Sequence, residues 1–214
     1  MRYFLTFLLT AAAFAQALPV PIENEWVKVI IAQDKPGQKS RLHKHDVNRV
    51  MIHLDPGTLR LAYEGKPVRD VKFKAGTVRW DPAGGMHTSE NPGAESFKIV
   101  EVELKKAGSP VTWPAKDPLK IAPKIYKVEY ENDQVRVVRV RIPAKGAIPQ
   151  HEHATKRVTV ALTDAKIQLT KADGSKVEAA FTAGEPRWGM PDVHAEQSLV
   201  DHPIELIMID VKSN

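Results

Sequence analysis

The most informative part of this chain lies at residues 41–57 and reads RLHKHDVNRVMIHLDPG. A similar stretch, PQHEHATKRVTVALTD, occurs at residues 149–164. Each contains a His-x-His pair, and because side chains alternate along a β-strand, both imidazoles of a pair point to the same face. A third histidine follows each pair. The chain therefore has two sets of candidate metal ligands: His43, His45 and His87, and His151, His153 and His194.

The similarity between the two halves extends well beyond the histidines. Glu23-Asn24 matches Glu131-Asn132, and Ala75-Gly76 and Arg79-Trp80 match Ala183-Gly184 and Arg187-Trp188, all at one offset. Only the last histidine slips, by a single residue, because the turn before it is shorter in the second half. Chance rarely keeps register over so many positions, so the pattern indicates an internal duplication.

Both halves have the texture of β-structure. Segments rich in Val, Ile and Leu are separated by turn signals such as Asp55-Pro56-Gly57 and Asp173-Gly174. Many short strands at this spacing predict an all-β sandwich or barrel. We expect one domain at residues 18–107 and a second at 125–214. Residues 108–124 carry four prolines and little periodicity, which predicts a linker.

The composition is that of a folded, soluble protein. Of 214 residues, 43% are hydrophobic and 27% charged, with a net charge of +5. No run of Lys and Arg interleaved with aromatic residues suggests a nucleic-acid groove, so we expect no nucleic-acid partner. The chain has no cysteine, which excludes disulfides, thiolate ligands and cysteine nucleophiles.

The first 17 residues, MRYFLTFLLTAAAFAQA, resemble a signal peptide. Arg2 supplies the positive charge, Phe4 to Phe14 form a short apolar core, and two A-x-A triplets offer cleavage sites. The apolar stretch is too short to span a bilayer comfortably. We therefore predict a cleaved signal and a secreted or periplasmic mature protein without a membrane span, the alternatives being a membrane anchor or a buried helix.

Two motifs resemble those of the cupin superfamily, specifically its two-domain bicupins. The family's second motif, G-x5-P-x-G-x2-H-x3-N, is complete in the first half: Gly76, Pro82, Gly84, His87 and Asn91. Its first motif, G-x5-H-x-H-x(3,4)-E-x6-G, fits through Gly37, His43, His45 and Gly57. In the second half Gly184 and His194 survive, while Ser198 takes the asparagine place. The resemblance implies two tandem double-stranded β-helix, or jelly-roll, barrels.

The glutamate of the first motif is missing from both halves. Depending on the spacing, its place falls at Arg49 and Arg157 or at Val50 and Val158. Strict alternation from His45 favours the arginine. The apolar run from Val50 through Leu54 favours an inward-facing valine row after a local bulge, and we prefer this second interpretation.

Three neutral imidazoles can hold Fe, Mn, Zn, Ni or Cu as divalent ions, with open positions for water or substrate. Among cupins, the thiol dioxygenases have three-histidine metal sites without this glutamate. The resemblance therefore implies that the missing glutamate does not exclude a metal. An arginine inside the shell would instead repel a dication and favour a metal-free pocket for carboxylate or phosphate. Arg49 and Arg157 are thus candidate substrate-binding residues, with surface ion pairing as the alternative. We expect the stronger metal site in the first half, because its second motif is intact.

These features predict an exported bicupin that binds a divalent transition metal and acts on a small, anionic molecule. The resemblance implies a range of metal-dependent enzymes that includes dioxygenases, decarboxylases and isomerases. A non-catalytic module for a sugar or organic acid, metal-free or vestigial, is the alternative, and a rigid scaffold is the third. Cupins often pair through their sheets, which makes a homodimer plausible.

Overall fold

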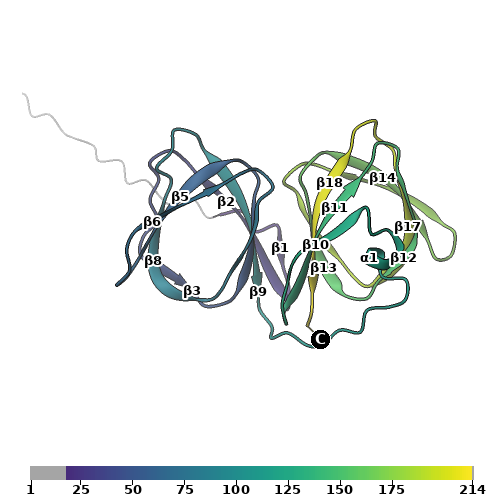
Figure 1. Ribbon diagram of the computed structural model, residues 1–214, viewed down its shortest axis with the longest axis horizontal. Helices are drawn as coiled ribbons and strands as arrows, with labels where there is room; N and C mark the ends of the chain where they lie inside the picture. The colour runs from purple at the N-terminus through teal and green to yellow at the C-terminus, as the bar shows by residue number, and fades with distance from the viewer. Residues whose placement is uncertain (1–17, 214) are drawn as a thin grey trace, which may run out of the picture.

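A computed structural model describes residues 18–213 of the chain (Figure 1). The predicted signal peptide at residues 1–17 lies outside the described residues, as does Asn214. Within the described part, no helix has the length and apolar character needed to cross a membrane.

The first half forms two antiparallel sheets that face each other as a barrel. The five-stranded sheet has the order β1 (Ile22–Glu23), β2 (Val27–Asp34), β9 (Phe97–Leu104), β4 (Arg49–His53) and β7 (Val78–Asp81). The four-stranded sheet has the order β3 (His43–His45), β8 (Gly84–Glu90), β5 (Gly57–Tyr63) and β6 (Arg69–Phe73).

The second half repeats this topology strand for strand. Its five-stranded sheet is β10 (Tyr126–Glu131), β11 (Val135–Ile142), β18 (Ile204–Val211), β13 (Lys156–Ala161) and β16 (Pro186–Gly189). Its four-stranded sheet is β12 (Ala147–His153), β17 (Asp192–Ser198), β14 (Ala165–Lys171) and β15 (Lys176–Phe181). The predicted all-β fold of two tandem barrels is confirmed, and we call the halves domain 1 and domain 2.

The proline-rich connector is held against domain 2. It contains α1 (Pro118–Ile121), which is capped by the Asp117 carboxylate. Asp117 and Asp210 both accept hydrogen bonds from Arg136, at 2.9 and 2.8 Å, and the Arg136 guanidinium stacks 3.3 Å from the ring centroid of Trp113. These buried charges fix the connector to the β11–β18 part of the barrel.

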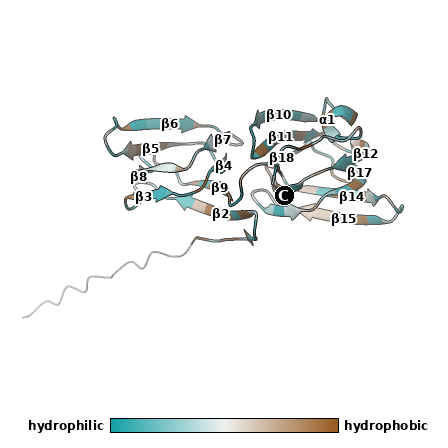
Figure 2. Cartoon of the chain, turned by 90° about the horizontal axis from the view of Figure 1, so that it is seen from below, coloured by the Kyte–Doolittle hydropathy of each residue, from teal (hydrophilic) through white to brown (hydrophobic). Residues whose placement is uncertain are grey.

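The two five-stranded sheets pack face to face between the domains, which stand side by side in both views (Figure 1, Figure 2). One apolar cluster contains valines and isoleucines of both halves. Trp26 stacks on Trp188 with centroids 5.9 Å apart, and Trp80 stacks on Tyr130 at 5.5 Å. The tryptophans of the Arg-Trp pairs therefore belong to the interdomain core.

This packing shows that the preferred position of the valine row was wrong. Val50 and Val158 are buried in the interdomain cluster, outside the barrel lumen. The neighbouring Met51 lies in a separate cluster inside domain 1. Because β4 and β13 are buried on both faces, an apolar run does not identify which face lines the lumen. The arginine alternative, Arg49, is the one that faces the histidines.

Candidate metal centres

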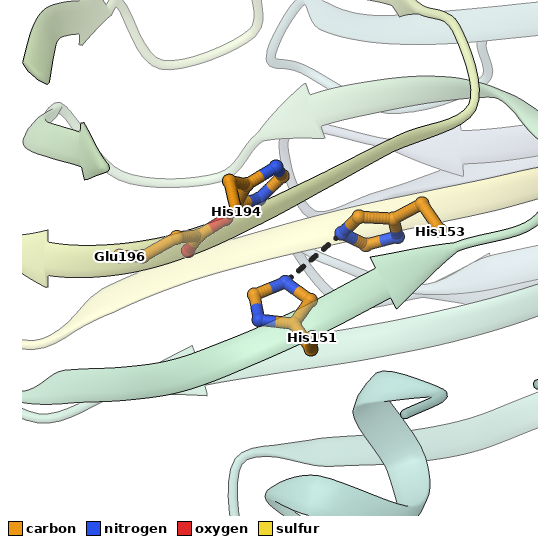
Figure 3. A group of neighbouring side chains, drawn as sticks. All are labelled: His151, His153, His194 and Glu196. Carbon is orange, nitrogen blue, oxygen red and sulfur yellow. Dashed lines mark hydrogen bonds and ion pairs between the residues drawn. The ribbon is translucent and has the colours of Figure 1, made fainter. Parts of the chain in front are cut away.

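In domain 2 three imidazoles and one carboxylate converge inside the barrel. His151 and His153 come from β12, and His194 and Glu196 from the adjacent β17; the side chains of both strands point toward one another (Figure 3). One ligand atom from each residue lies within 4.8 Å of all the others. All three histidines are buried.

The spacing of the two β12 imidazoles suits a shared ion. Their Nε2 atoms are 3.1 Å apart, and two nitrogens bound about 2.1 Å from one ion in tetrahedral or octahedral geometry are separated by about 3.0–3.4 Å. The Nδ1 of His151 is 2.9 Å from the carbonyl oxygen of Pro149 and donates to it, so its Nε2 lone pair faces the cluster. Burial lowers the pKa values of His151 and His153, and the Arg157 charge adds to this at His153, which keeps both rings neutral.

His194 lies between two carboxylates. Its Nδ1 is 2.9 Å from Asp192 Oδ2 and its Nε2 is 2.9 Å from Glu196 Oε1. Burial alone would lower the pKa of His194, but the two hydrogen bonds outweigh burial and raise it to about 9. Asp192 thus holds the outer nitrogen, as the carboxylate partners of metal-bound histidines do, while Glu196 stands beside the inner one as a candidate ligand.

In domain 1 the three histidines also meet, and no carboxylate of the described residues joins their group. His43 and His87 are paired across β3 and β8, with ring centroids 4.5 Å apart, and His45 lies 4.9 Å from His43. Ligand atoms of the three lie within 4.8 Å of one another. The Nδ1 atoms of His43 and His87 donate to the carbonyl oxygens of Arg41 and Gly85, at 2.8 and 2.9 Å.

His45 differs because its Nδ1 faces Arg49. The Arg49 Nη1 atom is 2.8 Å from His45 Nδ1 and is always a donor, so this nitrogen accepts and the ring proton sits on Nε2. Burial and the Arg49 charge lower the pKa of His45 to about 4. A fixed positive charge therefore lies beside the ring, and Nδ1 is engaged by Arg49.

Arg49 is itself held by two carboxylates. It bonds Asp81 at 2.6 Å and Glu101 at 2.6 Å, and the whole residue is only 5% exposed. In domain 2, Arg157 is tied instead to Asp192 at 2.8 Å and to the carbonyl oxygen of Met190 at 2.6 Å. Both arginines form ion pairs, as the alternative predicted, but neither lies on the surface, because each closes off the wall of its barrel.

Solved structures share this architecture at low sequence identity. AerE from Microcystis aeruginosa superimposes with a TM-score of 0.65 at 17% identity, covering 92% of this chain and 99% of its own. A variant of oxalate decarboxylase from Bacillus subtilis superimposes with a TM-score of 0.62 at 14% identity, covering 88% of this chain and 69% of its own. The fold is of the cupin type.

Another oxalate decarboxylase structure from Bacillus subtilis, described for its Mn(II) centers, superimposes with a TM-score of 0.60 at 11% identity and covers 89% of this chain and 70% of its own. No family model matches the sequence, and no curated protein matches it. At these identities the similarity establishes the cupin fold alone.

The six histidines named from the sequence come together in two clusters, three in each barrel. Glu196 was not among the candidate ligands named from the sequence, where only the missing glutamate of the first motif was considered. The carboxylate comes from β17, two residues beyond His194, and not from the first motif. The signal was available as His194-Ala195-Glu196, since residues two apart on a strand share a face.

Proposed function

We propose that domain 2 binds one divalent transition metal through His151, His153, His194 and Glu196. The observation that carries this proposal is the convergence of three imidazoles and a carboxylate within 4.8 Å on two paired strands. This donor set supplies one negative charge and suits Fe, Mn, Zn, Ni or Cu. Manganese in the oxalate decarboxylase described above is compatible with the same choice.

The surrounding residues have separate tasks in this proposal. Asp192 and the Pro149 carbonyl orient His194 and His151 by accepting their Nδ1 protons. A bound metal would act as a Lewis acid toward an oxygen of a small molecule. Arg157 neutralises Asp192 and does not approach the cluster as a free cation. On this basis we propose a metal-dependent reaction of the dioxygenase, decarboxylase or isomerase type.

We further propose that domain 1 takes no metal as built. The fixed Arg49 charge beside His45 opposes a dication, and within residues 18–213 no carboxylate lies among the three histidines. This reverses the order expected from the motifs, which favoured domain 1. A non-catalytic role for domain 1 as a ligand-binding or supporting barrel follows from the same observation.

Export remains part of the proposal, on the basis of the N-terminal sequence. Amino-terminal sequencing of the protein from its native host distinguishes a chain that begins after residue 17 from one that retains Met1. A chain that retains Met1 would overturn the cleaved signal peptide.

Metal analysis of the purified chain tests the metal assignment. We expect about one transition-metal ion per chain by plasma mass spectrometry, lost in His194→Ala and kept in His87→Ala. Because the two histidines are equivalent in the duplication, each variant is the control of the other. Two ions per chain would show that domain 1 binds metal as well, and loss only in His87→Ala would show that domain 1 is the occupied site. A chain that takes up no metal after incubation with Mn(II), Fe(II) or Zn(II) would leave a binding module without metal.

A further inference from the structure

A small cavity adjoins the domain 2 cluster and shares His153, His194 and Glu196 with it. Its volume is about 110 Å³, which is the space of roughly three to four water molecules or a branched group of three to four carbons. Most of the remaining wall is apolar: Val140, Ile167, Leu169, Phe181, Leu206 and Met208.

The charged residues of the wall are already neutralised. Arg157 reaches the cavity, but its guanidinium is occupied by Asp192 and by the Met190 carbonyl oxygen. Asp192 is bonded in turn by His194. Among the described residues of this wall, a ligand entering the cavity therefore meets no cation that is free to pair with a second negative charge.

We infer that the ligand of domain 2 is a compact molecule with an oxygen chelate at one end and a short branched hydrocarbon group at the other, carrying at most one negative charge. The inference rests on the proposed metal site, because the chelating end needs the ion. The apolar wall accepts the hydrocarbon group and gains affinity by removing it from water. A dianion without hydrocarbon, such as oxalate, leaves that wall uncovered and its second charge unpaired.

The position in domain 1 that corresponds to Met208 carries a charged side chain in place of an apolar one. Met208 pairs with Thr159 on β13, as Glu101 pairs with Met51 on β4. The duplication thus places a buried carboxylate in one lumen where the other has a methionine. Met208→Glu introduces that difference into domain 2 without touching a proposed metal ligand.

Calorimetric titration of the metal-loaded full chain tests the inference, with metal content measured beforehand. The probes are 2-oxoisovalerate, a monoanionic chelator with an isopropyl group, pyruvate, which has only a methyl group there, and oxalate. We expect 2-oxoisovalerate to bind at least about tenfold more tightly than either of the others. The comparison of 2-oxoisovalerate with pyruvate isolates the hydrocarbon group, and the comparison of pyruvate with oxalate, which has a second carboxylate in place of the acetyl group, reports the second charge.

Two variants link the preference to the cavity. Met208→Glu is expected to weaken the binding of 2-oxoisovalerate at least about tenfold at unchanged metal content, while Val68→Glu, which places the same charge on an exposed side chain of domain 1, leaves that binding unchanged. Since Met208→Glu places a charge in the core, Phe181→Ala on the half-buried rim provides a second measurement. It enlarges the cavity and should shift preference toward the bulkier 2-oxo-4-phenylbutanoate by about tenfold.

The outcomes distinguish a wrong ligand class from a missing metal site. A metal-loaded chain that binds oxalate or pyruvate as tightly as 2-oxoisovalerate overturns the ligand class and leaves the metal site standing. A metal-loaded chain whose preference is unchanged in Phe181→Ala overturns the assignment to this cavity. A chain that takes no metal removes the proposed function, and the inference with it.

Discussion

The two barrels place the same three histidines on equivalent strands but surround them with groups of opposite charge. In domain 1 the histidines lie beside a cation, Arg49, and in domain 2 beside an anion, Glu196. The difference is carried by a few equivalent positions, namely Ser89 and Glu196, Asp81 and Gly189, and Glu101 and Met208.

This contrast shows that a duplicated histidine motif does not by itself duplicate a metal site. Three imidazoles are neutral when they ligate, so the charge of the fourth group strongly affects whether a dication is favoured. In domain 1 the carboxylates of Asp81 and Glu101 form ion pairs with Arg49 and not with a metal ion. In domain 2 the arginine is drawn to the wall and the carboxylate faces the histidines.

The largest effect expected from breaking this comparison is on stability. Arg49→Met leaves the partly buried carboxylates of Asp81 and Glu101 without their cation, which should lower the free energy of unfolding by about 3 kcal/mol. Arg157→Met should cost about 1 kcal/mol, because Asp192 keeps His194 and is 45% exposed. Urea unfolding followed by tryptophan fluorescence measures both. Adding Glu101→Met to Arg49→Met should restore part of the loss, and equal costs for the two arginines would contradict the asymmetry.

The next effect concerns metal affinity. Glu196→Gln removes the negative charge next to His194 and should weaken binding in domain 2 by about 100-fold, measured by competition with a chelator of known affinity. Glu178→Gln, on an exposed residue of β15 in the same sheet, is the matched control. Ser89→Glu gives domain 1 the equivalent carboxylate. It should add no second ion while Arg49 remains, so a second ion in Ser89→Glu alone would contradict the role assigned to that arginine.

Much of the fold was predictable from the sequence, and the reason is physical. Period-two alternation and repeated turn signals are local, so the strands, the duplication and the meeting of His43, His45 and His87 could be predicted. The burial of Val50 against the other domain could not. An apolar side chain on a strand is buried equally well by a lumen or by a second barrel, and the sequence does not distinguish them.

The sequence was limited in a similar way when the two candidate metal sites were ranked. The intact glycines, proline and asparagine of the second motif in domain 1 describe a turn, and Asn91 indeed bonds the backbone there through its side-chain amide. The donor set was decided by Arg49 and Glu196, which lie on other strands from the His-x-His pairs. Their closeness to the histidines follows from strand pairing across the barrel, which spacing along the chain does not give.

A third test uses a buried histidine that only domain 1 possesses. His53 is 1% exposed, and its ring stacks on Phe73 with centroids 3.8 Å apart. Neither ring nitrogen has a hydrogen-bond partner among the described residues. The equivalent residue in domain 2 is Ala161. Burial, with the Arg79 charge, lowers the pKa of His53 to about 4. The unfolded chain takes up this proton near pH 6.5 and the folded chain only near pH 4, so stability falls as the pH drops between these values.

His53→Leu should therefore make the protein less sensitive to acid. Between pH 7 and pH 5 the free energy of unfolding of the wild type should fall by about 2 kcal/mol more than that of the variant. Urea midpoints at the two pH values provide the measurement, and His202→Leu, at an exposed histidine, is the control. An identical pH dependence in wild type and His53→Leu would mean that His53 is already protonated in the folded protein or never titrates.

The smallest effect concerns the outer partner of the third histidine in each barrel. Gly85 holds the Nδ1 of His87 with a backbone carbonyl, while Asp192 holds the Nδ1 of His194 with a carboxylate, each two residues before its histidine. Asp192→Asn keeps an oxygen acceptor but removes the charge, so metal affinity in domain 2 should fall about tenfold, less than for Glu196→Gln. Asp192→Ala removes the acceptor as well, so the metal affinity should fall further. Because Asp192 also bonds Arg157, the double variant with Arg157→Met shows which contact matters: if Asp192→Asn loses affinity only while Arg157 is present, the freed arginine is the cause and the orientation of His194 is not.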